Sequence, residues 1–297
     1  MRQGIYYAYW EQEWKADYLQ YIPKVAKLGF DVLEIACTPI PDMSEQEMIR
    51  LRESAEAHGI TLTAGHGPHA SQNLASEDPA TVKSAITFYT DLLKRLDLMN
   101  IRTIGGGIYS YWPIDTSKPI DKKADWARSV NNVREVAHIA GELGIAYCLE
   151  VLNRFEGYLL NTAAEGRAFI DEVGHDAVYL MLDTFHMNIE EDSFARAILT
   201  AGDKLGHFHT GEANRKVPGS GRMPWQEIIQ ALVSIGYDRA MVMEPFVREG
   251  GQVGSDIKIW RDVSEGADEA QLDQAAKDSA AFCRSLVNLS QSNSRVL

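Results

Sequence analysis

Two patterns of apolar residues alternate along the whole chain. Short continuous apolar runs are typical of β-strands that are buried on both faces, and apolar residues that recur every three or four positions are typical of amphipathic helices. The apolar runs predict strands at residues 4–10, 31–37, 61–67, 102–109, 146–152, 205–210 and 240–246, and a further strand within 178–188.

Capping signals mark where several of the intervening helices begin. Ser44 and Thr162 are each followed three residues later by a glutamate, which is the capping-box pattern, and Asp78 precedes a proline. Pro23 lies within the first helical pattern, where it predicts a kink or a late helix start. Helices are predicted up to about residue 27, at 44–59, 78–99 and 122–143, from 162, and at 193–201, 224–235 and 268–289.

Strands that alternate with helices predict an α/β protein with parallel strands and crossover helices. Eight such units in 297 residues fit a closed (β/α)₈ TIM barrel better than an open doubly wound sheet. Because no linker interrupts the pattern, residues 1–297 are expected to form a single domain with a frayed tail from about 290. The glycine cluster at 105–107 lacks the GxGxxG spacing of a dinucleotide site.

The charge and composition of the chain indicate which binding partners and which cellular compartment to expect. The net charge of -13 disfavours nucleic acid and anionic membranes, both of which require a basic face. The three cysteines are far apart and show no CxxC spacing, so a disulfide framework is not expected. The chain shows no signal-peptide pattern and no apolar run of the roughly 20 residues that span a bilayer. A cytoplasmic protein is therefore expected.

Polar side chains appear where four consecutive predicted strands end. In a parallel barrel the carboxyl ends of all strands open onto one face, so these side chains should converge. Three carboxylates and one imidazole form an oxygen-rich set that suits Mn²⁺, Mg²⁺ or Co²⁺, and octahedral coordination leaves two positions open for a substrate. The predicted ligands are Glu150, Asp183, His209 and Glu244.

Each of these residues also has a structural interpretation. Glu150 could instead pair with Arg154 or Arg215. Alternation places His207 on the same side of its strand as His209, and His207 is expected to be a hydrogen-bonded residue of the barrel interior.

Other residues near the predicted site have two interpretations as well. His186 could be a substrate contact or a satisfied core histidine, and His66 is expected to support its surroundings while His69 lies on the surface. The aromatic residues could be a substrate wall or ordinary core: Tyr6, Trp14, Trp112 and Phe246.

Long runs in the sequence resemble the ketose 3-epimerase family, which includes the D-psicose (D-allulose), D-tagatose and L-ribulose 3-epimerases, and the psicose branch is the nearest. The runs are 4–11 (GIYYAYWE), 110–113 (SYWP), 150–156 (EVLNRFE), 181–192 (MLDTFHMNIEED), 206–212 (GHFHTGE) and 243–246 (MEPF). The resemblance covers nearly the whole chain and implies the xylose-isomerase-like form of the barrel. At Gly107 the sequence departs from relatives, which more often have alanine there.

The resemblance also implies roles for individual residues. It places the metal ligands on Glu150, Asp183, His209 and Glu244, with Mn²⁺ or Co²⁺ as the ion. It implies a homodimer or homotetramer and a small-molecule ketose as substrate. The implied substrate-binding residues are Glu156, His186 and Arg215, with Tyr6, Trp112 and Phe246 as an apolar wall.

The expected reaction is epimerisation at C3 of a free ketose, of the D-fructose/D-psicose type, through a cis-enediolate. Glu150 and Glu244 would serve as the two acid/base groups on opposite faces of C3. Three alternatives remain open from the sequence: an aldose–ketose isomerase on the same barrel, a metal-dependent phosphodiesterase of the abasic-site endonuclease type, and a non-catalytic metal-dependent sugar-binding protein.

Overall fold

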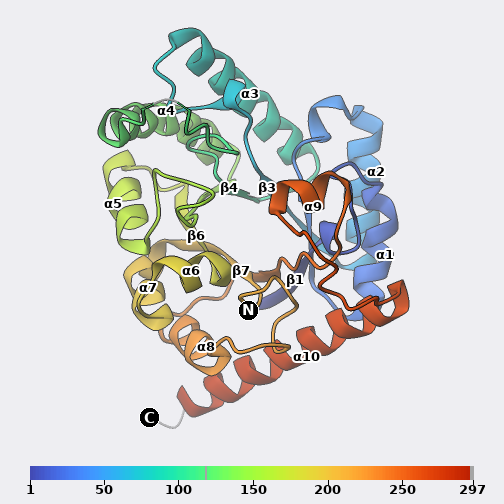
Figure 1. Ribbon diagram of the computed structural model, residues 1–297. Coiled ribbons are helices and arrows are strands. Elements are labelled where there is room, and N and C mark those ends of the chain that lie inside the picture. The colour runs from blue at the N-terminus through green and yellow to red at the C-terminus, as the bar shows by residue number, and fades with distance from the viewer. Residues whose placement is uncertain (118, 295–297) are drawn as a thin grey trace.

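Eight parallel strands close into one barrel in the computed structural model, which describes residues 1–117 and 119–294 (Figure 1). Each strand pairs with the next in chain order, and β8 closes the barrel by pairing with β1. This closed order confirms the predicted TIM barrel and excludes the open sheet. The strands are β1 (Arg2–Tyr6), β2 (Val32–Ala36), β3 (Thr61–His66), β4 (Thr103–Gly106), β5 (Ala146–Glu150), β6 (Val178–Asp183), β7 (Leu205–Thr210) and β8 (Ala240–Met243).

Helices connect the strands and surround the barrel (Figure 1). Two short helices, α6 and α9, were not predicted, because each lies within a segment of mixed polarity that follows a strand. The helices are α1 (Tyr18–Leu28), α2 (Glu45–His58), α3 (Pro79–Leu98), α4 (Lys122–Glu142), α5 (Ala163–Val173), α6 (Thr184–Glu190), α7 (Phe194–Ala201), α8 (Trp225–Ser234), α9 (Gly251–Ile257) and α10 (Glu269–Ser294).

Several predicted boundaries are wrong in a consistent way. The strands predicted at 4–10, 102–109, 146–152 and 240–246 all end earlier, because the residues beyond them are buried in loops or in short helical turns such as Tyr7–Tyr9. An apolar pattern reports burial and does not distinguish a strand from a buried loop.

Pro23 lies inside α1, so the helix does not begin there. The final helix continues to Ser294, beyond its predicted end at about 289. The predicted frayed tail stays a prediction, and its last residues, 295–297, lie outside the described residues.

The capping predictions are confirmed. The Ser44 hydroxyl accepts a hydrogen bond from the Glu47 amide and the Glu47 carboxylate accepts one in return, and Gly59 ends α2 in the left-handed conformation that glycine favours. Asp78 caps α3 and Thr162 caps α5.

In the described part of the chain, none of the helices has the length and apolarity required to cross a membrane.

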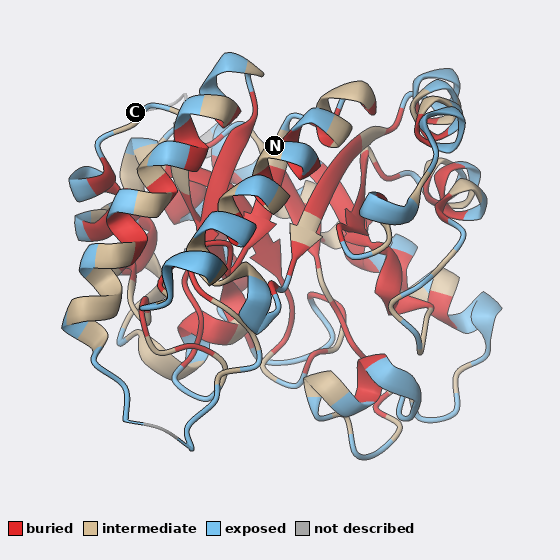
Figure 2. Cartoon of the chain, turned by 90° about the horizontal axis from the view of Figure 1, so that it is seen from above, coloured by how far each residue is buried: buried red, intermediate tan, exposed pale blue. Residues whose placement is uncertain are grey.

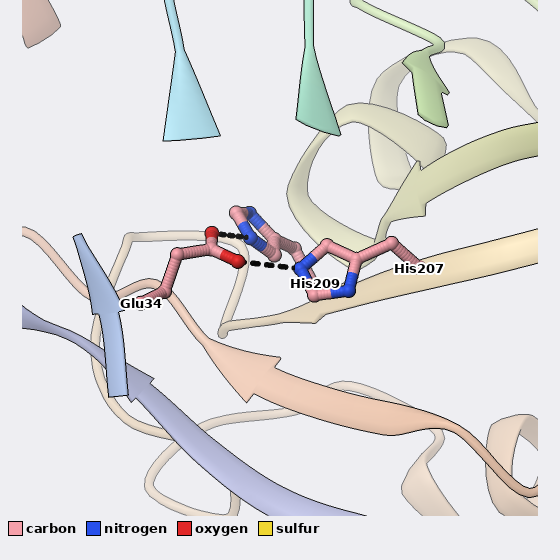
Figure 3. A group of neighbouring side chains, drawn as sticks. All are labelled: Glu34, His207 and His209. Atoms are coloured by element: carbon pink, nitrogen blue, oxygen red, sulfur yellow. Dashed lines mark hydrogen bonds and ion pairs between the residues drawn. The ribbon is translucent and has the colours of Figure 1, made fainter. Parts of the chain in front are cut away.

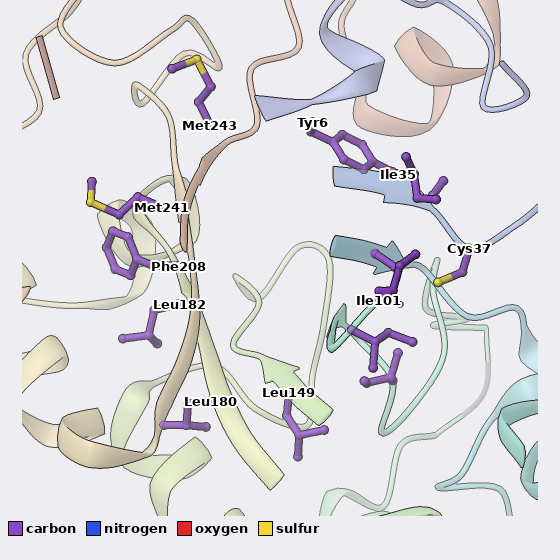
Figure 4. Close-up of a cluster of buried hydrophobic side chains, with 14 of the residues drawn as sticks. Tyr6, Ile35, Cys37, Ile101, Leu149, Leu180, Leu182, Phe208, Met241 and Met243 are labelled. Carbon is purple, nitrogen blue, oxygen red and sulfur yellow. The ribbon is translucent and has the colours of Figure 1, made fainter. Parts of the chain in front are cut away.

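Most strand residues are buried (Figure 2). Because successive side chains of a strand point to opposite faces, these buried side chains fall into two sets. One set, which includes Ile35, Leu149 and Phe208, belongs to the main hydrophobic core (Figure 4). The other set forms small separate clusters that contain residues such as Val32, Cys148, Met181 and Val242.

The second set determines where the polar residues lie. Two positions beyond its apolar members, in the direction of the carboxyl ends, the same strands carry carboxylates, and a period of two keeps them on the same face. The alternation therefore directs a layer of acids into the upper end of the barrel: Glu34, Glu150, Asp183 and Glu244.

We predict that Thr162→Ala lowers the free energy of unfolding by about 1 kcal/mol, because the Thr162 hydroxyl accepts a hydrogen bond from the Glu165 amide at the start of α5. Chemical denaturation measures this change. Thr87→Ala is the matched control, because Thr87 is exposed in the interior of α3 and its hydroxyl donates only to its own helix. Equal losses in the two variants would contradict a capping role.

Candidate active site at the carboxyl ends of the strands

The structure brings the predicted metal ligands together around Asp183. Ligand atoms of Asp183, His209 and Glu244 lie within 4.8 Å of one another. A second group that meets the same limit contains Glu150, Asp183 and His186. The four predicted ligands are thus divided between two groups that share Asp183, and the group of Glu150 contains His186 in place of His209 and Glu244. Asp183 caps α6 through its other oxygen.

His209 shows that this cluster fits a cation. Its Nδ1 lies 3.9 Å from Asp183 Oδ2 and 3.6 Å from Glu244 Oε2. Although it is buried, this nitrogen has no hydrogen-bond partner among the described residues. A buried polar atom without a partner is costly, and here it faces carboxylate oxygens at a distance that leaves space for an ion. The donor set of oxygens and one imidazole matches a hard divalent cation.

Glu34 is a site residue that the sequence analysis missed. It is fully buried in the middle of β2, and its two oxygens accept from His207 Nε2 at 2.6 Å and His209 Nε2 at 2.5 Å (Figure 3). His207 is therefore the hydrogen-bonded interior residue that was predicted. A carboxylate inside an otherwise apolar strand was the available signal.

The charges of this group support one another. Burial acts to raise the pKa of Glu34, but His207 and His209 outweigh it and hold that pKa below its ordinary value. Burial also opposes a charge on His209, yet the carboxylates of Glu34 and Glu244 raise the pKa of its imidazole well above the usual range.

Glu150 and His186 form the other side of the site. His186 Nε2 lies 3.6 Å from Glu150 Oε1, and burial lowers the pKa of His186 to about 3. Burial raises the pKa of Glu150 well above its ordinary value; His209 opposes this shift and Glu244 adds to it. Asn153, to which no role was assigned from sequence, lies 2.7 Å from His186 Nδ1 through its amide nitrogen and donates to Glu156 Oε1 at 3.0 Å.

Arg215 supplies the buried cation of the site. Its Nη1 lies 3.1 Å from Glu244 Oε2 and 3.4 Å from Asp183 Oδ2, and its Nη2 lies 3.8 Å from Glu156. The guanidinium stacks over Phe185, 3.7 Å from the ring centroid, so Phe185 is a third residue that sequence reasoning missed.

The structure does not show the alternative ion pair between Glu150 and Arg154 that the sequence suggested. Arg154 pairs with Glu190 and not with Glu150. His66 contacts Gln72 through Nε2 and stacks on Phe88, and His69 is exposed, yet both histidines also line the cavity at the carboxyl ends of the strands.

A cavity of about 290 Å³ opens above the acids. All six predicted substrate-binding residues line it together with Glu150, His209 and Glu244, and Asp183 lies beside it. Trp14 also lines the cavity, and its Nε1 donates to Asp256 of α9, so this helix forms part of the wall. The six residues are Tyr6, Trp112, Glu156, His186, Arg215 and Phe246.

A family profile described as a xylose isomerase-like TIM barrel matches residues 22–286. The D-psicose 3-epimerase of Ruminiclostridium cellulolyticum is 62% identical over 96% of this chain and 97% of its own length, and that of Agrobacterium fabrum is 56% identical over 96% and 98%. The crystal structure of D-psicose 3-epimerase with D-tagatose from Clostridium cellulolyticum H10 superposes with a TM-score of 0.96, at 62% identity, over 97% of this chain and 99% of that one. The chain belongs to the ketose 3-epimerase family of isomerases.

Gly107, where the resemblance led us to expect alanine in relatives, lines the cavity. A Cβ atom there would lie 3.6 Å from Leu152 Cδ1 and 3.8 Å from Pro68 Cδ, which is ordinary van der Waals contact. The fold therefore accommodates alanine at this position, and glycine leaves the cavity one methyl group wider.

We predict that Asp183→Asn weakens Mn²⁺ binding by at least about tenfold, because it removes a charge from the residue shared by both ligand groups. Asparagine also caps helices, so α6 should be retained. Metal content after Mn²⁺ loading and dialysis measures the effect. Asp192→Asn removes the same charge from an exposed position and should keep its metal; unchanged metal content in Asp183→Asn would exclude Asp183 as a ligand.

Proposed function

We propose that this enzyme epimerises free ketoses at C3, interconverting D-fructose and D-psicose, with one divalent cation at Glu150, Asp183, His209 and Glu244. Mn²⁺ is the proposed ion, with Co²⁺ and Mg²⁺ as possible substitutes. The observation that carries the proposal is the placement of two carboxylates, Glu150 from β5 and Glu244 beyond β8, around one cavity that also contains the unpartnered His209 nitrogen. The names of the similar enzymes support the choice of reaction.

The chemistry requires a weakly acidic proton to leave C3 and another to arrive on the opposite face. A bound cation would supply Lewis-acid polarisation of the ketone. One glutamate takes the C3 proton, the electron pair moves into the C2–C3 bond, and a cis-enediolate forms with its charge on O2. The other glutamate, protonated at the start, delivers its proton to C3 from the opposite side. The two glutamates exchange protonation states in each turnover.

The surrounding residues favour this sequence of steps. Burial raises the pKa of Glu150 above its ordinary value, whereas Glu244 accepts a hydrogen bond from Arg215. Arg215 and His186 would donate toward the oxygen on which charge develops. Glu156, which accepts a hydrogen bond from Asn153, would orient the O1 end of the sugar.

The apolar side of the cavity would hold the carbon skeleton. Tyr6 and Phe246 pack edge to face with ring centroids 6.1 Å apart, and Trp112 lines the same cavity. Apolar walls with a few polar groups are the usual composition of small-molecule sites.

We also propose a homodimer or homotetramer in the cytoplasm. Phe155 and Trp260 are 76% and 72% exposed, and an interface between copies would cover such large apolar side chains. A reducing compartment accords with three cysteines that are buried and free.

We predict that D-fructose incubated with the Mn²⁺-loaded enzyme in D₂O gives D-psicose and takes up deuterium at C3. NMR of the recovered sugars locates the label, and a chelator should stop both product formation and exchange. Label at C1 with an aldose product would show instead that the enzyme is an aldose–ketose isomerase. Binding without any product would show a sugar-binding protein.

We predict that Glu150→Gln and Glu244→Gln each lower kcat by about 10²–10⁴-fold at saturating Mn²⁺, since each removes one of two acid/base groups. Metal content is measured alongside, and partial retention of Mn²⁺ is expected. Glu227→Gln, at an exposed position on α8, is the matched control and should keep its rate. A metal-loaded Glu150 or Glu244 variant with a wild-type rate would contradict the two-base scheme.

A further inference from the structure

We propose that Glu34 is a positioning residue that fixes the tautomer and ring orientation of His209 so that its Nδ1 lone pair faces the cation site. This inference rests on the proposed function, because it concerns the same cation. It assigns a role to the middle of β2, a strand to which the sequence analysis assigned no site residue.

The first step concerns the hydrogen bonds that Glu34 accepts. Its Oε2 lies 2.6 Å from His207 Nε2 and accepts from the Thr63 hydroxyl at 2.7 Å. Its Oε1 lies 2.5 Å from His209 Nε2 (Figure 3). An ionised carboxylate only accepts, so each histidine must donate an Nε2–H to it.

The second step follows for the neutral form of His209. When the Nε2 of an imidazole carries its only proton, the Nδ1 carries a lone pair. That nitrogen is buried, unpartnered among the described residues, and turned toward Asp183 and Glu244. The hydrogen bond from Glu34 on one edge of the ring therefore prepares the opposite edge for a metal ion.

The third step concerns why Glu34 itself stays in place. Glu34 pairs in register with Thr63 across β2 and β3, and the hydroxyl of that neighbour fixes one oxygen. His207 lies two residues before His209 on β7, so one strand supplies both imidazoles and the carboxylate bridges them. The three donors restrain rotation of the carboxylate, which in turn restrains the ring of His209. A ligand whose ring is held in its binding orientation loses less entropy when the ion binds.

The variant Glu34→Gln tests this role, because an amide keeps the size of the side chain but offers one acceptor and one donor. If the NH₂ group faces His209, Nε2 must accept and the proton moves to Nδ1, where it blocks the ion. If the NH₂ group faces His207, the amide oxygen still accepts from His209 Nε2, but His207 and Thr63 both lose the acceptor that restrains the side chain. Either orientation weakens the arrangement.

We predict that the Mn²⁺ dissociation constant of Glu34→Gln, measured by isothermal titration calorimetry on the full chain, rises about 10–100-fold. Most of the wild-type kcat should return at saturating Mn²⁺, because Glu34 does not touch the substrate cavity. A dissociation constant within twofold of wild type would overturn the proposal.

Glu212→Gln is the matched control. Glu212 is a second buried glutamate near the same end of the barrel, and it accepts from the amides of Gly219 and Met223 and from Trp225 Nε1. This variant should lose stability yet bind Mn²⁺ within twofold of wild type. Equal losses of Mn²⁺ affinity in both variants would show that a general loosening of the barrel is responsible, and would also overturn the proposal.

A measurement on the wild type decides the matter even if Glu34→Gln does not fold. Histidine ¹⁵N NMR of the Mg²⁺-loaded enzyme should show His209 protonated at Nε2 and not at Nδ1, with His209→Gln used to assign its signals. An Nδ1–H tautomer would overturn the inference. A wild type that neither binds Mn²⁺ nor epimerises a ketose would instead refute the proposed function, so the two failures are distinguishable.

Discussion

The cost of burying carboxylates inside the barrel governs the arrangement of this enzyme. Glu34 and Asp183 are almost completely excluded from water, and Glu150 and Glu244 lie just above them with little exposure. An unpaired charge in such surroundings is strongly unfavourable, so the fold must supply compensating groups. His209 and Arg215 are the compensating groups at the centre of the cluster, and a divalent cation would complete the balance of charge.

The geometry of a closed parallel barrel makes this cluster possible. Because side chains alternate along a strand, Cys148 and Glu150, or Val242 and Glu244, point to the same side, with the apolar member deeper in the barrel. The apolar lower layer is packed, so the acids meet only at the carboxyl end. The packed apolar layer thereby brings the negatively charged carboxylates of the site close together at one end of the barrel.

The fold and the residues at the centre of the site could be predicted from the sequence. The residues that hold those central residues in position could not. Glu150, Asp183, His209 and Glu244 were recognisable because each is polar at the end of an apolar run, and the barrel geometry requires such ends to meet. Strand ends were extended too far, since buried loop residues such as Tyr7 have the same apolar character as a strand.

Two of the missed residues, Asn153 and Phe185, were missed for the same physical reason. Asn153 and Phe185 act through contacts with His186 and Arg215 that depend on how loops and α6 are placed, and local patterning does not encode those distances. The α9 wall of the cavity depends on contacts between distant parts of the chain, such as the one from Trp14 to Asp256. Glu34 is different: its burial in β2 required a partner, and the histidines of β7 were the available candidates once both strands were placed in a barrel.

The unequal surroundings of the two proposed acid/base groups follow from the same constraint. Glu150 lies 3.6 Å from His186, a histidine whose own pKa is lowered by burial, and the more distant His209 is the group that opposes the rise of the Glu150 pKa. Glu244 faces the permanent charge of Arg215 at 3.1 Å. Two chemically identical side chains are thus placed in different fields, which is how one fold separates an acid from a base. An epimerase needs that difference to be small enough to reverse in every turnover, and a ketose bound between Arg215 and His186 would change the field at both glutamates.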